Sequence, residues 1–329
     1  MQKIALSTAV LIASFSFTTH ARPLGEAGWS GEISINTGYA SQTSNFNTDG
    51  DKTLSSQNAK AESDDGFLAA PLGNIAYTFG EGNSKQFYAG TSRADIAVGD
   101  VAFEIGYKQK LASGTVVDVS ILPTIIENET WVDPYAVGTE RKTTDESGNA
   151  YRLKLSSIGG SLFSLDFAYA HIDVDDELSA SDSKFSTDTQ EAMRRDGSHY
   201  YLKGDMRLFI DRDTFIVPAL KYNRRTADGD AMAYNAFGAD ISYFKSIGRH
   251  QFALTGGYEY RDYDETNPVF GKKRDDHALS AFLAYEMEEL NGWENVSLIS
   301  FAGYGQSNSA ITFYDESQYI VTLGLNYQF

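Results

Sequence analysis

The sequence contains no cysteine and little proline. Of its 329 residues none is Cys and only 6 are Pro, whereas 20 are Tyr, 20 are Phe and 3 are Trp. The lack of cysteine excludes disulfide bonds, thiol catalysis and thiolate metal sites. The aromatic residues instead suit pleated surfaces and membrane interfaces. The composition therefore favours a β-rich chain at a membrane, with a large soluble β-sandwich as the alternative.

The chain also lacks a net positive charge. The chain has 27 basic and 45 acidic residues, a formal net charge of −18. A nucleic acid would be repelled by this field, and no cluster of Lys and Arg with interleaved aromatics offsets it. We therefore expect no nucleic-acid partner.

Long apolar runs are absent after the N-terminus. Residues 1–21 begin with Lys3, continue through the apolar stretch Ile4 to Phe17, and end at small residues up to Ala21. This pattern predicts a signal peptide cleaved after Ala21, leaving residues 22–329 as one domain. A retained anchor is the alternative, but the run is shorter than the ~20 residues that a spanning helix needs. Any later membrane crossing must therefore use strands.

Period-two alternation is the main structural signal. In residues 31–40, Ile33, Ile35 and Tyr39 alternate with polar or small residues. Similar stretches recur with about the 9–11 residues that a tilted membrane strand requires. The predicted strands are residues 31–40, 70–79, 86–93, 100–110, 115–125, 150–157, 162–173, 198–209, 214–225, 232–245, 250–263, 277–287, 293–304 and 317–329. The prediction is an all-β, antiparallel up-and-down transmembrane barrel of about 14 strands, or 12 if the weak third strand is misassigned.

Short and long connections alternate between these strands. The short ones, predicted to be periplasmic turns, are residues 80–85, 111–114, 158–161, 211–213, 246–249 and 289–292. The other connections are predicted to be extracellular: residues 41–66, 93–100, 127–149, 175–197, 227–231, 264–276 and 305–316. The polar tract 41–66 is predicted to form no core. An even strand number places both termini on the periplasmic side.

The last strand carries a family resemblance. Its apolar face ends in an aromatic and consists of Tyr319, Val321, Leu323, Leu325, Tyr327 and Phe329. It resembles the closing strand of Gram-negative outer-membrane barrels, whose assembly machinery reads a terminal Tyr-x-Phe pattern. The chain is similar to porin-like proteins of families known only as domains of unknown function. The resemblance implies location in the cell outer membrane, with lipid, lipopolysaccharide and the barrel-assembly machinery as partners.

Charged side chains identify the inner face. A Lys or Arg facing hydrocarbon at mid-depth costs about 2–4 kcal/mol, so alternating charges belong inside. The predicted pore lining is Glu32, Glu104, Lys108, Asp118, Arg152, Lys154, Asp166, Lys203, Asp205, Arg207, Lys221, Asp240, Glu259, Arg261 and Glu286. Four of its basic residues, Arg152, Lys154, Lys203 and Arg207, either form a strip suited to an anionic solute or pair with Asp166 and Asp205.

Two functions fit a barrel with this interior. An open lumen would be a porin-like channel for passive diffusion of small hydrophilic solutes, with acidic loops favouring cations at its mouth. A lumen plugged by paired charges would instead leave the long loops 41–66 and 175–197 as a surface-binding or adhesive face. Fourteen strands lie between the filled eight-stranded and open sixteen-stranded barrels, so strand number does not decide.

The loops offer little for catalysis. Asp49-x-Asp51 and Asp275-x-His277 resemble the rim pairs of omptin proteases, although omptins have ten strands and Asp49 lies deep in a loop. Acidic segments such as Asp228-Gly229-Asp230 could supply calcium ligands, but there is no complete calcium loop. Serine-hydrolase, Walker and dinucleotide motifs are absent. We therefore expect no metal, no cofactor and no enzymatic activity.

Overall fold

The computed structural model describes residues 23–123, 128–182 and 184–329, so the predicted signal peptide, residues 1–21, lies outside the described residues. The strands are β1 Gly28–Thr43, β2 Ser63–Phe79, β3 Lys85–Thr91, β4 Phe103–Lys110, β5 Val116–Pro123, β6 Asn128–Trp131, β7 Thr143–Ser156, β8 Phe163–Val174, β9 Gly197–Met206, β10 Leu208–Phe209, β11 Thr214–Ala227, β12 Tyr234–Ile247, β13 His250–Asn267, β14 Lys272–Met287, β15 Val296–Ser309 and β16 Glu316–Gln328. The helices are α1 Arg93–Ile96 and α2 Thr187–Ala192, with single 3₁₀ turns η1 Glu81–Asn83, η2 Ile158–Gly160, η3 Asp230–Met232, η4 Leu290–Gly292 and η5 Thr312–Tyr314. None of the helices in the described ranges is long and apolar enough to cross a bilayer.

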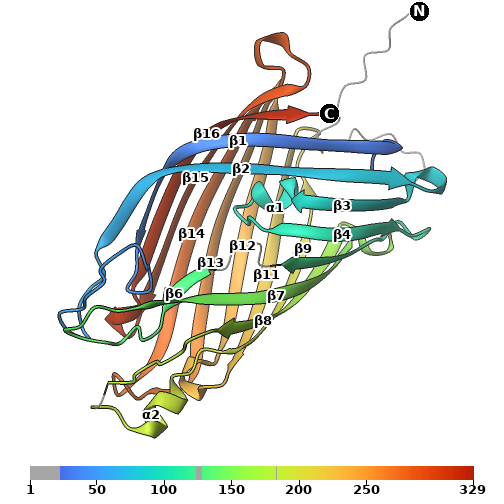
Figure 1. Ribbon diagram of the computed structural model, residues 1–329. Helices are drawn as coiled ribbons and strands as arrows, with labels where there is room; N and C mark the ends of the chain where they lie inside the picture. The colour runs from blue at the N-terminus through green and yellow to red at the C-terminus, as the bar shows by residue number, and fades with distance from the viewer. Residues whose placement is uncertain (1–22, 124–127, 183) are drawn as a thin grey trace, which may run out of the picture.

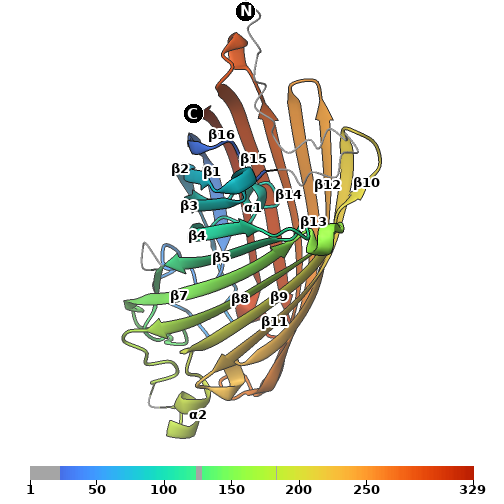
Figure 2. The same cartoon turned by 90° about the vertical axis from the view of Figure 1, so that its right-hand side faces the viewer.

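These strands form a closed antiparallel barrel (Figures 1 and 2). It has fourteen strands around its wall when β5 with β6, and β9 with β10, are each counted as one interrupted strand. The short β6 pairs with β7 on the same side as β5 does, farther toward the extracellular end. Likewise β10 extends β9 along β11. The barrel closes where β1 pairs with β16 from Glu32↔Gln328 to Thr43↔Ser317. The prediction of fourteen strands is thus confirmed, and the alternative of twelve is wrong.

The closing seam requires a residue without a side chain. Gly38 lies opposite Thr322 in the register of β1 with β16. A Cβ at Gly38 would collide with the backbone oxygen of Val321 and with Thr322. The first and last strands approach this closely because backbone hydrogen bonds inside a membrane must be made within the protein.

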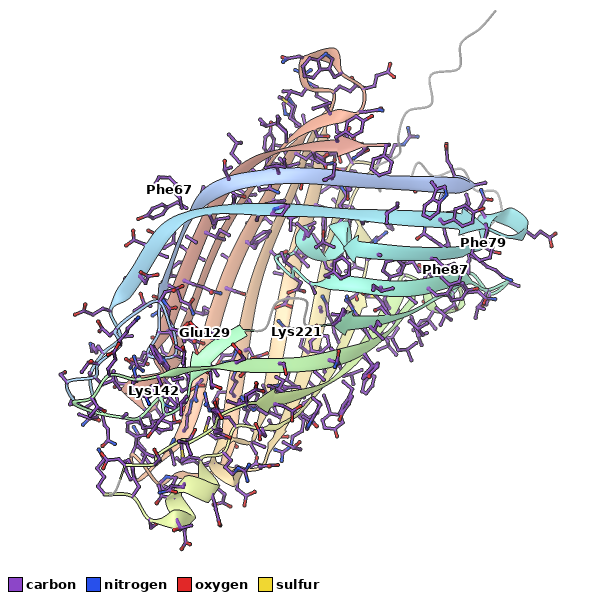
Figure 3. All side chains as sticks on the ribbon, in the orientation of Figure 1. Phe67, Phe79, Phe87, Glu129, Lys142 and Lys221 are labelled. Atoms are coloured by element: carbon purple, nitrogen blue, oxygen red, sulfur yellow. The ribbon has the colours of Figure 1, made fainter. Side chains whose placement is uncertain are left out.

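Alternation along each strand produces an apolar outer band. Ile33 and Ile35 of β1 are exposed on the outside, whereas Ser34 and Asn36 between them are buried inside. Aromatic rings mark the two edges of the band: Phe79 stacks on Phe87 near the periplasmic turns, and Tyr39 meets Phe67 at the opposite edge (Figure 3). Such girdles flank the apolar band of outer-membrane barrels. The chain is therefore an outer-membrane β-barrel, as predicted.

The strands extend farther on the extracellular side than predicted. β2 begins at Ser63, inside the predicted loop 41–66, and β7 begins at Thr143, inside the predicted loop 127–149. Likewise β13 and β14 extend into the predicted loop 264–276. Polar residues in these stretches pair as strands because they project beyond the hydrocarbon, where a strand needs no apolar outer face. The short periplasmic turns lie where predicted.

Six of the seven extracellular connections meet in one apolar core. These connections, here called the dome, are residues 44–62, 132–142, 175–182 with 184–196, 228–233, 268–271 and 310–315. The buried core residues are Leu54, Tyr135, Ala180, Met193, Ala231, Met232, Ile311, Phe313 and Tyr314. The loops come from strands around the whole barrel, so they must cross the mouth in order to meet. The prediction that residues 41–66 form no core was wrong, because Leu54 and Phe46 join apolar residues of other loops.

Polar groups in the dome core are satisfied by one another. The hydroxyls of Tyr135 and Tyr314 lie 2.9 Å apart, and the Asn267 amide donates to Tyr314 at 2.8 Å. Burial, together with the Tyr314 hydroxyl, raises the pKa of Tyr135 well above its usual value. The Arg274 guanidinium stacks 3.7 Å from the centre of the Tyr314 ring and pairs with buried Asp276. The dome is thus a specifically packed unit.

We predict that Phe313→Ala opens the dome without unfolding the barrel. Phe313 is 1 % exposed, and removing such a ring from a core costs about 3–5 kcal/mol. The loops should then be cut faster by a protease added outside lipid vesicles, while the barrel keeps its heat-dependent migration on gels. Phe67→Ala is the matched control, because Phe67 is 92 % exposed on the outer wall. Equal cleavage of the two variants would show that the loops do not share a core.

Candidate functional site: the constricted lumen

The structure places the predicted pore-lining residues at inward-facing positions of the strands, except Arg207, which lies at the break between β9 and β10. Most of them are paired with other charged or polar side chains of the interior. Arg207 differs, because its guanidinium stacks 5.2 Å from the centre of the Phe215 ring. Asp205 and Lys203 lie on the same face of β9, and Lys203 is opposite Lys221 of β11. Their role as the wall of a conducting path stays a prediction.

The seventh extracellular connection folds into the lumen instead of joining the dome. Residues 92–102, here called the crossing segment, link β3 to β4 and contain α1 (Figures 1 and 2). The helix begins where the Ser92 hydroxyl accepts a hydrogen bond from the Asp95 amide at 3.4 Å. Gly99 has a φ of +95°, and a Cβ at this position would lie 3.0 Å from the Phe282 ring of β14. The segment therefore reaches the wall opposite its own hairpin.

The first turn of the crossing segment is held on one side by an acidic wall. The Arg93 guanidinium donates to Glu32 of β1 at 2.8 Å and pairs with Glu286 of β14. Glu32 also accepts hydrogen bonds from Asn74 at 2.9 Å and Asn326 at 3.1 Å. A cation held by two carboxylates needs little further compensation, so Arg93 anchors the segment to the closing seam.

The same helical turn is held on its other side by a basic wall. Asp95 accepts from Arg152 of β7 at 2.7 Å and lies 3.4 Å from Lys154. Burial alone would raise the pKa of Asp95, but Lys154 and Arg152 hold it well below its usual range. Asp95 is therefore ionised at any physiological pH. Asp100, farther along the segment, has its pKa raised by burial, which the charges of Lys203 and Lys221 partly offset.

Arg152 is the centre of the basic wall. Besides Asp95 it contacts Glu104 at 3.0 Å and Asp166 at 2.5 Å, and both carboxylates are almost fully buried. A planar guanidinium has five donors in fixed directions, which lets one Arg serve three carboxylates. Of the two interpretations of the basic strip, mutual pairing therefore describes Arg152 and Lys154, while Lys203 and Arg207 take part in none of the ion pairs formed among the described residues.

Smaller pairs complete the interior. The Tyr88 hydroxyl donates to Asp118 at 2.7 Å, and Lys108 lies 4.3 Å from the centre of the Tyr88 ring. On the far side Lys221 pairs with Asp240 at 2.8 Å. A chamber of about 290 Å³ remains above the crossing segment, lined in part by Lys221, Glu259 and Gln318. The lumen is thus narrowed by side chains and by the segment, with polar space left between them.

The sequence prediction missed Arg93 and Asp95 as residues of the lumen. It placed residues 93–100 in a short extracellular loop. Ser92-Arg93-Ala94-Asp95 is a Ser-x-x-Asp pattern, which indicates a helix start in that loop. This pattern could have identified the helix. It does not show that the helix lies inside the lumen, because that position depends on how short β3 and β4 are.

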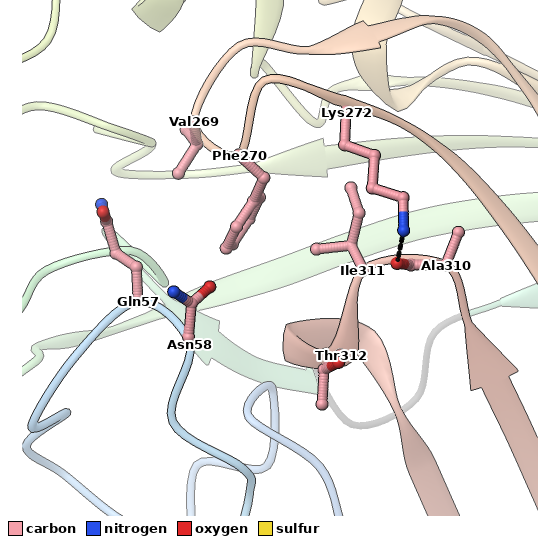
Figure 4. Close-up of a pocket in the computed structure, with 8 residues that line it drawn as sticks. All are labelled: Gln57, Asn58, Val269, Phe270, Lys272, Ala310, Ile311 and Thr312. Carbon is pink, nitrogen blue, oxygen red and sulfur yellow. Dashed lines mark hydrogen bonds between the residues drawn. The ribbon is translucent and has the colours of Figure 1, made fainter.

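A second hollow lies on the dome. It measures about 280 Å³ and lies between the loops containing Gln57, Phe270 and Ile311 (Figure 4). The Lys272 ammonium donates to the Ala310 carbonyl at its edge. The hollow combines an aromatic ring with side-chain amides, which suits a small polar ligand more than an apolar one.

The described contacts do not join the two omptin-like pairs. His277 is an outward residue of β14 whose ring bonds the Tyr258 hydroxyl at 2.7 Å and lies 3.7 Å from Asp275. Asp51 instead accepts from Arg141 through its backbone oxygen, within the dome. In the described ranges no three His, Asp or Glu side chains are grouped to hold a metal.

Solved outer-membrane proteins are similar to the chain at very low sequence identity. The outer membrane channel DcaP of Acinetobacter baumannii is 10% identical, covers 94% of this chain and 100% of its own, and has a TM-score of 0.43. The anion-selective porin from Comamonas acidovorans is 9% identical over 92% of this chain and 100% of its own, with a TM-score of 0.41. OmpT of Vibrio cholerae, folded in vitro, is 8% identical over 94% and 100%, with a TM-score of 0.42.

No curated protein matches the chain. The resemblance of the terminal strand to porin-like barrels of unknown function is nevertheless confirmed by one family comparison. A model described as "Protein of unknown function (DUF2860)" matches residues 28–328, nearly all of the barrel, and the chain therefore belongs to that family.

Proposed function

We propose that the protein is a narrow porin-like channel through which small hydrophilic solutes diffuse passively across the outer membrane. The crossing segment sets its width. The observation that carries the proposal is the double anchoring of this segment, by Arg93 on the acidic wall and Asp95 on the basic wall. Such opposed walls give a transverse field that favours polar, hydrated solutes over apolar ones.

The remaining lumen supports this proposal. The chamber above the crossing segment is lined largely by polar side chains, including Gln42, Ser280 and Gln318. Paired charges in the wall present both donors and acceptors to a passing solute without a strong excess of either sign. A wall of this kind suits passage better than tight binding, because conduction needs weak and repeated contacts.

The surroundings of the barrel follow from the same proposal. The strand from Tyr319 to Phe329 would be the segment that the barrel-assembly machinery reads. The apolar band would contact outer-membrane lipid, and the polar strand ends beyond it would contact lipopolysaccharide.

The anchoring of the crossing segment predicts the behaviour of Arg93→Ala. Losing this cation leaves Glu32 and Glu286 unpaired and mutually repelling, so the segment should leave the closing wall. Single-channel current in a planar bilayer should rise about twofold or more over the native protein, with more open-state noise. Arg207→Gln is the matched control, because it removes one inner-wall cation that stacks on Phe215 and is not paired with the segment. Equal conductance of Arg93→Ala and the native channel would exclude the segment as the constriction.

Net charge predicts ion preference. The chain carries 45 acidic against 27 basic residues, and acidic groups recur in the extracellular loops. Electrostatic focusing at the mouth should favour cations. The reversal potential in a potassium chloride gradient measures this directly, and it should shrink at high salt because screening weakens surface fields. An anion preference would contradict the focusing, though not the channel itself.

The dome favours a second candidate function, a closed barrel that binds through its outer surface. Six loops packed across the mouth give a defined outer face with a hollow between Gln57, Phe270 and Ile311. A correctly folded barrel that stays silent in the bilayer would favour this candidate. Gln57→Ala with Asn58→Ala should then weaken adhesion of cells that carry the protein, whereas Arg207→Gln, deep in the lumen, should not. Unchanged adhesion of cells with the Gln57→Ala, Asn58→Ala variant would exclude this hollow as the binding site.

A further inference from the structure

The chamber above the crossing segment exists because small residues lie side by side on the inner wall. Inward residues that are registered neighbours on successive strands form rows around the barrel. Between the long polar side chains at their ends, two successive rows carry nothing longer than serine. These small residues are Ala278 and Ser307 in the upper row and Gly257, Ser280 and Gly305 in the lower row. They leave the hollow of about 290 Å³.

The chamber lies between the constriction and the dome. Below Ser280, the next inward residue of β14 is Phe282, and a Cβ at Gly99 of the crossing segment would lie 3.0 Å from the Phe282 ring. Two inward positions above Ser280 is Asp276, which pairs with Arg274, a side chain that stacks on the dome core. A solute that crosses the lumen along this wall therefore passes through the chamber.

The charged residues of the chamber already compensate one another. Lys221 pairs with Asp240 at 2.8 Å (Figure 3). Arg261 pairs with Glu259 at 2.8 Å and lies 4.0 Å from Glu316. Every charged residue that lines the chamber thus has an opposite charge beside it. An ion or a zwitterion would have to compete with these pairs, so the chamber does not favour a charged solute.

Neutral hydrogen-bonding groups of the chamber are free. Within the described ranges, the side chains of Gln42, Ser280 and Gln318 make no hydrogen bond, and all three are exposed to the lumen. Gln42 and Gln318 are opposite each other in the register of β1 with β16, so their amides lie on the same patch of wall. Ser280 is separated from Gln318 only by Gly305, which has no side chain to come between them.

A buried hydroxyl on the same wall is also unsatisfied. Ser307 lines the chamber and is 4 % exposed, and its Oγ has no hydrogen-bond partner among the described residues. Buried polar groups are nearly always hydrogen-bonded, to protein, water or ligand. Ser307 therefore adds a group that a molecule in the chamber can satisfy, directly or through a bridging water.

This set of groups matches a neutral solute rich in hydroxyls. An amide offers two N–H donors and a carbonyl acceptor, and a serine hydroxyl both donates and accepts. A sugar hydroxyl also donates and accepts, so it can bond either kind of group without leaving a charge uncompensated. Small-molecule sites measure about 300–1,000 Å³, and the chamber is at the lower end of that range. Its size therefore suits a single sugar ring.

We propose that the chamber is a binding site for a neutral, monosaccharide-sized solute on its way between the dome and the crossing segment. This inference rests on the proposed channel function and names the class of solute that the channel takes. Gln42 and Gln318 bind the solute from β1 and β16, and Ser280 and Ser307 bind it from β14 and β15. The contacts are few and uncharged, so the solute is held weakly enough to leave.

Protection of a single thiol tests the site in the full-length protein. The chain contains no cysteine, so Ser280→Cys places one thiol in the chamber, where a small uncharged methanethiosulfonate reagent can modify it. Glucose should slow this modification about tenfold when nine chambers in ten are occupied, because only empty chambers react. Ser164→Cys is the matched control, since residue 164 lies opposite Asp205 on another part of the inner wall. Its rate of modification should not depend on glucose.

Two further substitutions, each combined with Ser280→Cys, test how the solute is held. Gln318→Leu should raise the glucose concentration needed for half protection about tenfold, because it removes an amide that bonds the solute. Gln109→Leu makes the same change on β4, where the amide bonds Tyr107 away from the chamber, and should leave that concentration unchanged. Gly305→Leu should abolish protection by filling the chamber, since a Cβ there already reaches within 3.5 Å of Gln318. All variants are checked for heat-dependent gel migration.

Glycine betaine tests the class of solute. It is a zwitterion no larger than glucose, and it would need the charges that are already paired in the chamber. It should therefore protect the thiol at position 280 much less than glucose does at equal concentration.

Four results would overturn the proposal. Glucose that does not slow modification at position 280 would show that the chamber holds no sugar, and a thiol at 280 that never reacts would show that the chamber is closed. Equal half-protection in Gln318→Leu and Gln109→Leu would exclude the amide, and stronger protection by glycine betaine would exclude the neutral class.

Single-channel current reports on the proposed channel separately. A silent barrel that still shows protection by glucose would contradict the channel and support the site. A conducting barrel without protection would exclude the site alone.

Discussion

Every level of this structure depends on one requirement, that backbone hydrogen bonds within a bilayer be made by the protein itself. The requirement forces β1 to pair with β16 and selects Gly38 at a position where a Cβ would collide with Val321 and Thr322. It also sets the height of the wall, because the strands must stay paired across the whole hydrocarbon layer. The aromatic girdles lie at the two edges of this paired wall. Among the described residues, the short hairpin of β3 and β4 leaves residues 63–73 of β2 and the whole of β6 without a strand on one side, and Pro71 of β2 has no N–H to leave unpaired there.

The interior obeys a second requirement, that buried charge be compensated. Arg152 with three carboxylates and Arg93 with two satisfy it, and in doing so hold the crossing segment in place. The same contacts therefore stabilise the fold and define the width of the lumen. Breaking a buried pair of this kind is costly because a charge is left alone, which gives the constriction a fixed geometry.

Much of the barrel could be predicted from alternation alone. A charge such as Glu104 between Phe103 and Ile105 fixes which face is inside, because the alternative would bury it in lipid. The dome could not be predicted, because each loop supplies only a few apolar residues, and the first supplies just Leu54 to the buried core, so that their meeting depends on distant loops. The inward course of Arg93 and Asp95 was missed for the same reason: their partners come from β1, β7 and β14.

The shared core of the dome has a consequence for the evolution of the cell surface. Loops of a barrel usually vary separately, because each is a tip tied only to its own hairpin. Here Tyr135, Phe313 and Met193 come from three hairpins and fill one volume. An insertion or exchange in one loop must therefore fit the other five, so the outer face of this protein is expected to diversify as a whole and slowly, even under pressure from phage or antibodies.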